Sequence, residues 1–506
     1  MRAPKLIEAK AAFLNKGCLG CHRVHGVGGE DGPDLSMTGR KNLSKLDFSH
    51  VPGNHDLAAW HKAHLSAPAQ IVPDSQMPQP VLDDKELDLI ALYLLSLRGE
   101  SDTMNGWPAD RLEAMRLGER EFATDGESLF NAFCNGCHGS EGFGTHFGIS
   151  PQVFPAVAHP EFLAVASNRF IRQTLVDGRP GRRMPSWGAK EGGLREEEVD
   201  SLLEYLRSKM PAMPSWEDVS KAGAEPALGA RLYRKTCAQC HGLNGEGIIG
   251  PALSNQVFLG TVEPQFIYRM IVTGREDTAM GSQPALSAGD IASIIMHIRN
   301  WRKEGLLKMP ALPRDRSAKK GEGVFARSCS PCHGKQGEGN FASNVSNPTL
   351  LSAASDGFMA AAVRYGRCAP PKGAPKSVEA PKVTDNELAD AIEYLRRLGR
   401  LGQPQLPGRP AQGDAANGDV LYAQMCAGCH GNRGIGGSAP ELGNAAFLAA
   451  ATDGYLQASI IRGRPSRGMP AFADDNVSYS KLTVEQVGDI VRSIRNMQNS
   501  EQAQGG

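Results

Sequence analysis

Apolar residues recur at helical spacing in five segments of the chain, each with the i, i+3, i+4, i+7 pattern that forms one buried stripe of an α-helix. Acidic residues precede the stripes at Asp83 and Asp84 and again at residues 196–198, which is typical of a helix N-terminus. The pattern therefore predicts five helices that pack on a core. Their apolar positions are Leu87, Ile90, Ala91 and Leu94; Val199, Leu202, Leu203 and Leu206; Ile291, Ile294, Ile295 and Ile298; Leu388, Ala391, Ile392 and Leu395; and Val487, Ile490, Val491 and Ile494.

A second apolar position opens each repeat. Residues four apart lie on the same face of a helix, so a large apolar residue four positions before a cysteine pair predicts a helix with a core face. These residues are Leu14, Phe130, Tyr233, Phe325 and Tyr422. The sequence thus predicts an all-α fold of five tandem domains joined by Pro-rich linkers. We expect the domains at 1–104, 118–210, 224–306, 317–401 and 414–499, and the linkers at 105–108, 210–214, 309–313 and 402–407. Such small domains need a buried group to complete their cores.

Charge and hydropathy exclude several classes of partner. Lysine and arginine together number 55, as do aspartate and glutamate, which argues against a nucleic-acid surface or a polybasic membrane tether. The chain has no apolar run of 18 residues, so we expect no transmembrane segment of its own. Residues 1–8 lack the apolar region of a signal peptide. Either a signal was removed from this numbering, or export occurs in a way that the sequence does not show.

Ten of the eleven cysteines fall in five Cys-x-x-Cys-His clusters. A lone Cys-x-x-Cys fits a redox dithiol or half of a zinc site. With histidine next, it indicates covalent haem c attachment, because two thiols one helical turn apart can each add to a vinyl group while the histidine ligates iron from the same side. Five copies predict five haem c groups. The clusters are Cys18, Cys21 and His22; Cys134, Cys137 and His138; Cys237, Cys240 and His241; Cys329, Cys332 and His333; and Cys426, Cys429 and His430.

The order of helix, Cys-x-x-Cys-His, Gly/Pro loop, Met-Pro and closing helix resembles the class I cytochrome c fold, five times over nearly the whole chain. The run from Trp60 to Pro68, followed by Ser75-Gln-Met77-Pro78, resembles cytochrome c subunits attached to respiratory membrane complexes. The resemblance implies a location on the periplasmic side of the bacterial cytoplasmic membrane. It also implies a proline whose carbonyl accepts a hydrogen bond from the ligating imidazole. The candidates are Pro33, Pro155, Pro251 and Pro440.

Methionine sulfur is the expected sixth ligand, and its position follows from spacing. Met280 and Met469 each lie 39 residues after the cluster histidine and 29 after the candidate proline. Met184 lies 46 residues after His138 but again 29 after Pro155. In the first repeat the candidate is Met77, and its distal loop is longer by 15 residues. Four histidines of that loop are alternatives: His50, His55, His61 and His64.

The fourth repeat departs from the pattern on both sides of the iron. Lys372 stands at the methionine position, Ser343 at the proline position, and the unpaired Cys368 lies four residues from Lys372. Three readings stay open: a neutral Lys372 amine with a lowered pKa, a Cys368 thiolate, or a five-coordinate iron open to a small ligand. Another residue, such as Met359, is a fourth option, although its surroundings favour core packing.

A Gly-Arg pair recurs five residues before the ligand position, with Arg179, Arg275, Arg367 and Arg464. The resemblance implies that these arginines meet haem propionates, since a planar cationic fork suits a carboxylate. The alternative is a solvated arginine in a turn.

Six-coordinate haem has no vacant position, so its chemistry is outer-sphere electron transfer rather than catalysis. We expect a pentahaem cytochrome that transfers electrons between redox partner proteins, as a periplasmic subunit of a membrane-bound respiratory complex. The alternatives are a free periplasmic shuttle, a haem enzyme or sensor using an open fourth haem, and a haem-free metal-binding scaffold.

Overall fold

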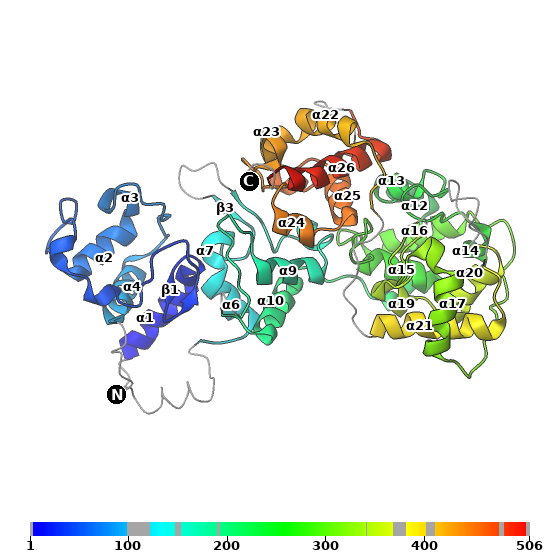
Figure 1. Ribbon diagram of the computed structural model, residues 1–506, viewed down its shortest axis with the longest axis horizontal. Coiled ribbons are helices and arrows are strands. Elements are labelled where there is room, and N and C mark those ends of the chain that lie inside the picture. Colours follow the sequence, from blue (N-terminus) through cyan, green and yellow to red (C-terminus); the bar gives the residue numbers. More distant parts are fainter. Residues whose placement is uncertain are drawn as a thin grey trace. The chain divides into compact units, whose positions relative to one another are not determined.

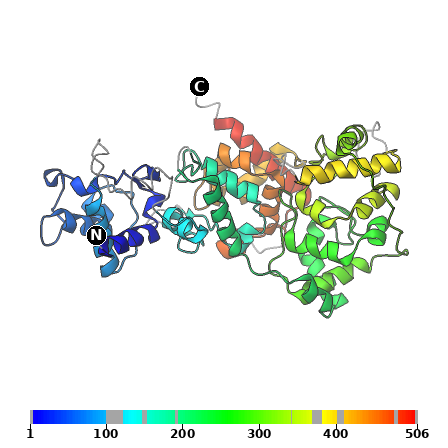
Figure 2. The same cartoon turned by 90° about the horizontal axis from the view of Figure 1, so that it is seen from below.

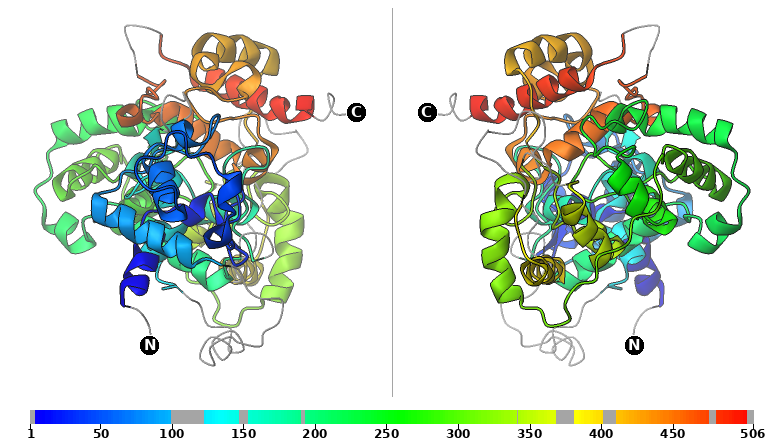
Figure 3. Two further views of the ribbon diagram at one scale, coloured as in Figure 1. Left: turned by 90° about the vertical axis from the view of Figure 1, so that its left-hand side faces the viewer. Right: turned by 90° about the vertical axis from the view of Figure 1, so that its right-hand side faces the viewer.

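The computed structural model describes residues 4–98, 122–146, 153–189, 193–340, 342–367, 381–400, 410–474 and 480–501. They form a helical protein in which one arrangement of helices occurs five times (Figure 1), which confirms the all-α prediction. Figure 2 and Figure 3 show the same repeats from other directions. Two compact units are present, residues 1–159, 168–209 and 428–450 in one, and 160–167, 210–427 and 451–506 in the other. Within the described residues, no helix combines the length and apolar character needed to cross a membrane.

Each repeat uses the same order of elements. The opening helices are α1 (Pro4–Asn15), α6 (Gly126–Phe133), α12 (Pro226–Thr236), α17 (Ala318–Ser328) and α22 (Ala415–Met425). A one-turn helix with the cysteine cluster follows: η1 (Cys18–Gly20), α7 (Asn135–His138), α13 (Ala238–His241), α18 (Ser330–His333) and α23 (Ala427–His430). Two helices lie in the middle: α2 (Leu57–Ser66) and α3 (Pro68–Ile71); α8 (Pro160–Leu163) and α9 (Asn168–Asp177); α14 (Gln256–Thr261) and α15 (Pro264–Thr273); α19 (Pro348–Ala353) and α20 (Asp356–Arg364); α24 (Ala445–Ala450) and α25 (Asp453–Arg462). The closing helices are α4 (Asp84–Ser96), α10 (Glu196–Ser208), α16 (Ala288–Arg299), α21 (Asp385–Arg400) and α26 (Val484–Glu501).

The remaining elements are short. The strands β1 (Arg23–Val24) and β2 (Val27–Gly28) pair antiparallel, as do β3 (Thr145–His146) and β4 (Val153–Phe154). Helix α11 (Trp216–Lys221) precedes the third repeat. Four further 3-10 turns are η2 (Thr38–Arg40), η3 (Leu43–Lys45), η4 (Asn432–Gly434) and η5 (Pro465–Arg467).

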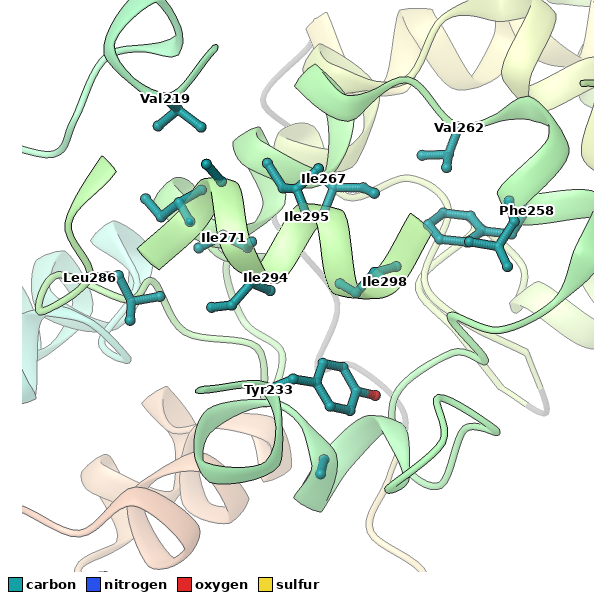
Figure 4. Close-up of a cluster of buried hydrophobic side chains, with 14 of the residues drawn as sticks. Val219, Tyr233, Phe258, Val262, Ile267, Ile271, Leu286, Ile294, Ile295 and Ile298 are labelled. Atoms are coloured by element: carbon teal, nitrogen blue, oxygen red, sulfur yellow. The ribbon is translucent and has the colours of Figure 1, made fainter. Parts of the chain in front are cut away.

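The closing helices follow the predicted stripes. Every stripe residue is buried except Leu87, which is half-buried. Capping boxes start two of these helices, with Asp83 and Glu86 at α4 and with Ser287 and Asp290 at α16. In the third repeat, α16 carries Ile294, Ile295 and Ile298 into the cluster drawn in Figure 4.

Four of the five predicted core positions in the opening helices are buried, namely Phe130, Tyr233, Phe325 and Tyr422. In the first repeat the prediction is wrong, because Leu14 is half-buried and Phe13 is the buried residue, at 1 % exposure. Helix α1 ends at Asn15, and Gly17 adopts a left-handed conformation before Cys18. This turn shifts the helix register relative to the cysteine.

Opening and closing helices touch through their backbones. In four repeats a glycine stands eight residues before the first cysteine, at Gly126, Gly229, Gly321 and Gly418. A Cβ atom at any of these positions would overlap a carbonyl oxygen of the closing helix, for example that of Asp390 for Gly321. These glycines therefore set how close the two helices approach.

Two of the predicted linkers, 105–108 and 402–407, lie outside the described residues. The linkers at 210–214 and 309–313 are largely free of regular structure. The predicted domain limits stay predictions.

Candidate haem sites

The cysteines and histidine of each cluster share one helical turn. The backbone N–H of His138 donates to the Cys134 carbonyl at 2.8 Å, and that of His241 donates to the Cys237 carbonyl at 3.0 Å. The same bond occurs in the first and fourth repeats. One turn thus carries two thiols and an imidazole, as thioether attachment with histidine ligation requires.

The ring of each cluster histidine is oriented by a carbonyl. In four repeats, Nδ1 of the cluster histidine donates to the carbonyl of the candidate proline. The bonds are His22 to Pro33 at 2.9 Å, His138 to Pro155 at 2.8 Å, His241 to Pro251 at 2.8 Å and His430 to Pro440 at 2.7 Å. Because a carbonyl only accepts, these bonds place the proton on Nδ1 and leave the Nε2 lone pair for a metal. The predicted prolines are confirmed.

The fourth repeat keeps this bond without proline. His333 Nδ1 donates to the Ser343 carbonyl at 2.7 Å. The sequence predicts that serine in place of proline would change the histidine side of this iron. For the hydrogen bond that prediction is wrong, because the acceptor is a backbone carbonyl that any residue supplies.

Burial favours the uncharged forms of the cluster imidazoles and thiols. It lowers the pKa of the His138 and His241 imidazoles, which favours the uncharged ring that ligates metals. It raises the pKa of the Cys18 and Cys134 thiols to about 12. A buried neutral thioether suits this environment better than the thiolates that bind zinc. The ten described cysteines are all outside disulfides.

Close packing around the ring leaves little freedom. The glycine before the proline lies against the imidazole, and a Cβ at Gly250 would be 2.7 Å from Cε1 of His241. A Cβ at Gly32 would be 2.4 Å from Cε1 of His22. These residues therefore fit a fixed, neutral ligand of a haem iron.

The candidate methionines follow the recurring arginine through a tight turn. The backbone N–H groups of Arg179, Arg275 and Arg464 donate to the carbonyls of Met184, Met280 and Met469, each at 2.7 Å. All three methionines are half-buried, as is Met77. The turn is therefore shared, while the sixth-ligand role of the four methionines stays a prediction.

Two of the recurring arginines have buried nitrogen atoms without an acceptor. Nε of Arg275 and Nε of Arg464 have no hydrogen-bond partner within the described part of the chain. Burial, with a smaller effect from Arg367, lowers the pKa of Arg275 to about 10. Each guanidinium also donates from Nη2, to the Asn344 carbonyl in Arg275 and to the Tyr455 hydroxyl in Arg464, so Nε is the donor that still needs an acceptor. A buried cationic N–H without an acceptor favours an anionic group, and a haem propionate fits.

Comparison with known proteins agrees with this chemistry. Residues 121–206, 224–298, 316–395 and 413–492 match the family model described as cytochrome c oxidase, cbb3-type, subunit III. The chain belongs to this cbb3-type subunit III family. Residues 7–98 match the model described as cytochrome c. The predicted resemblance to a multihaem c-type cytochrome of tandem cytochrome c domains is confirmed.

Relatives of this chain include the cbb3-type cytochrome c oxidase subunit FixP of Bradyrhizobium sp. (strain ORS 278). It is 25% identical over 185 residues, which cover 35% of this chain and 59% of FixP. The cytochrome bc1 complex cytochrome c subunit of Corynebacterium diphtheriae is 24% identical, over 39% of this chain and 72% of that subunit. The chain thus spans about three fifths of FixP. The solved thiosulfate dehydrogenase (TsdBA) of Marichromatium purpuratum is 16% identical over 72% of this chain and 87% of that chain, with a TM-score of 0.15, too low to bear on function.

The first repeat buries a ring nitrogen in two of its four extra histidines. His61 and His64 have a buried ring nitrogen without a partner among the described residues, and burial lowers the pKa of each to about 4. The His64 ring stacks on Trp60 with centroids 5.0 Å apart. His50 and His55 are exposed. Among the four alternatives to Met77, His61 is thus buried and His64 half-buried, and the choice of ligand stays a prediction.

In the fourth repeat, Cys368 and Lys372 lie outside the described residues. Met359 packs against three apolar clusters, which confirms its expected core role.

Proposed function

We propose that this chain is a pentahaem c-type cytochrome that transfers electrons one at a time between redox partner proteins. The cysteines of the five clusters would hold the haems as thioethers, and the five cluster histidines would ligate iron. Met77, Met184, Met280 and Met469 would supply the sixth ligand in four repeats. When bound, haem c supplies one-electron redox chemistry.

The single observation that carries this proposal is the hydrogen bond from the cluster histidine to a carbonyl, which occurs in all five repeats at 2.7–2.9 Å. It fixes the tautomer and the orientation of five imidazoles in the same way. The chain's own residues thus orient a neutral nitrogen, bury it and place two thiols beside it. This arrangement supports iron ligation by the five cluster histidines.

We further propose that the protein acts on the periplasmic side of the cytoplasmic membrane as a partner of a membrane-bound respiratory complex. The names of the relatives support this, since FixP is a cbb3-type oxidase subunit and the Corynebacterium relative is a bc1 complex subunit.

The test is the intact mass and the redox titration of the purified full-length protein. We expect a mass increment of five haems that survives denaturation, and complete reduction and reoxidation by one-electron mediators. A paired variant, Cys237→Ala with Cys240→Ala, should lose one haem. A colourless protein without the increment would overturn the proposal.

A further inference from the structure

The cysteine clusters of the first and second repeats lie against each other within one compact unit. The Sγ atoms of Cys21 and Cys137 are 4.0 Å apart, although the residues are 116 positions apart in the sequence. Next to them, the Asn135 side-chain amide donates to the Asn15 carbonyl at 2.9 Å. The two clusters therefore meet at the second cysteine of each motif.

Glycine makes this contact possible. Gly20 and Gly136 both occupy the third position of Cys-x-x-Cys. A Cβ at Gly136 would be 2.6 Å from the Gly17 carbonyl oxygen, and a Cβ at Gly20 would be 2.9 Å from that of Phe133. Any larger residue at either position would push the two motifs apart.

The fifth repeat offers a natural contrast. Its glycine at the same motif position, Gly428, has open space within 4 Å of where a Cβ would stand, and the neighbouring Cys429 is exposed. Cys137, by contrast, is buried, at 8 % exposure. Cys21, its partner in the contact, is half-buried, so both second cysteines of this contact are less exposed than Cys429.

We propose that the contact between Cys21 and Cys137 is the electron-transfer junction between the first and second repeats. This inference rests on the proposed function. Each sulfur would carry one porphyrin edge, so two carbon–sulfur bonds and one van der Waals contact separate the two edges. The step moves one electron and no atom: the iron of the donor repeat goes from ferrous to ferric, and that of the acceptor from ferric to ferrous. Because tunnelling slows steeply with distance, a contact that places both attachment edges together favours this route.

The experiment compares Gly136→Ala with its matched control Gly428→Ala in the full-length protein carrying its haems. Haem content comes first, by intact mass. Circular dichroism in the Soret region then reports coupling between neighbouring porphyrins, and pulsed one-electron reduction reports electron redistribution within the molecule. For Gly136→Ala we expect a weaker Soret couplet and a slower redistribution phase. Gly428→Ala should match the unsubstituted protein in both.

A milder variant protects the test against misfolding. Asn135→Ala removes one hydrogen bond of the junction without adding an atom, so it should change both signals in the same direction but less. If Gly136→Ala fails to fold or to take up haem, Asn135→Ala decides the question. If whichever of these two variants carries five haems shows unchanged Soret coupling and unchanged redistribution kinetics, the proposed junction is wrong.

Failure of the proposed function looks different. It would appear in the unsubstituted protein as missing haem, or as no exchange of electrons with external mediators. Loss of the junction alone leaves five haems that mediators still reduce.

Discussion

The contact between the first and second repeats and the contact between the third and fourth repeats are built from opposite chemistry. In the first, two cysteine sulfur atoms lie 4.0 Å apart, and glycines allow this close approach. In the second, Arg275 donates from Nη2 to the Asn344 carbonyl at 2.5 Å, and the Arg367 guanidinium lies 4.6 Å from the centre of the Phe258 ring. The first contact pairs a nearby cation, Arg183, with Asp31 at 3.4 Å, whereas the second contact carries two cations, Arg275 and Arg367.

Under the proposed haem attachment, this difference bears on which edge of each haem would face the neighbouring repeat. The cysteines would hold the vinyl edge of a haem, whereas the arginines would meet the propionates at the opposite edge. We therefore expect the first contact to respond to distance and the second to charge. Packing inside a repeat gives the reference against which both contacts are measured.

The largest effect is expected at a helix crossing. Gly321→Ala in α17 would force a methyl group into the Asp390 carbonyl, and such overpacking costs about 3 kcal/mol. Gly323 lies in the same helix with open space around it, so Gly323→Ala should stabilise the helix by roughly 0.5–1 kcal/mol. Hydrogen exchange of the α17 and α21 amides measures both. Equal effects of the two variants would show that the crossing is not glycine-dependent.

Lowering the pH should destabilise the first repeat more than the contact between the third and fourth repeats. The pKa of His61 is about 4 in the folded chain, against 6.5 as its ordinary value, so the unfolded chain binds the proton more readily. Stability from this ring is complete above pH 6.5 and decreases as the pH falls toward 4, by roughly 3 kcal/mol. His61 lies in α2 of the first repeat, and the permanently charged arginines between the third and fourth repeats add no such dependence. Hydrogen exchange of α2 at several pH values, corrected for intrinsic rates, should show the loss, and His61→Gln should reduce it. A flat profile in the unsubstituted protein would contradict the prediction.

A smaller effect is expected from charge at the contact between the third and fourth repeats. Arg275→Gln removes a buried cation. Its removal should stabilise the ferric state of the nearby haem and so lower the reduction potential of that haem. One charge at roughly 15 Å in a medium of effective dielectric constant about 20 is worth about 1 kcal/mol, or roughly 50 mV for one electron. Potentiometric titration measures the shift, with the exposed Arg467→Gln as control. If both variants gave the same reduction potentials, charge would not set the contact between the third and fourth repeats apart.

Much of the fold could be predicted because its signals are local. Helical stripes and the spacing from proline to methionine depend on residues within one repeat. The glycine eight residues before the cysteine was missed, although it recurs in the printed sequence at Gly126, Gly229, Gly321 and Gly418. The Cys21–Cys137 contact could not be predicted, because which repeats pack together depends on surfaces distant in sequence. The buried state of His61 likewise depends on tertiary packing.

The smallest effect tests what the proline contributes, and the third and fourth repeats supply the comparison. Pro251 and Ser343 offer the same carbonyl to the cluster histidine, at 2.8 and 2.7 Å. Pro251→Ser should therefore keep the hydrogen bond to His241 and leave the reduction potential unchanged. It should lower stability by about 0.4–1 kcal/mol, because serine gives the unfolded chain more freedom. Potentiometry and urea unfolding separate the two effects. A shifted potential would mean that the ring of Pro251, beyond its carbonyl, positions the imidazole, and the fourth repeat would then differ from the others on this side of the iron after all.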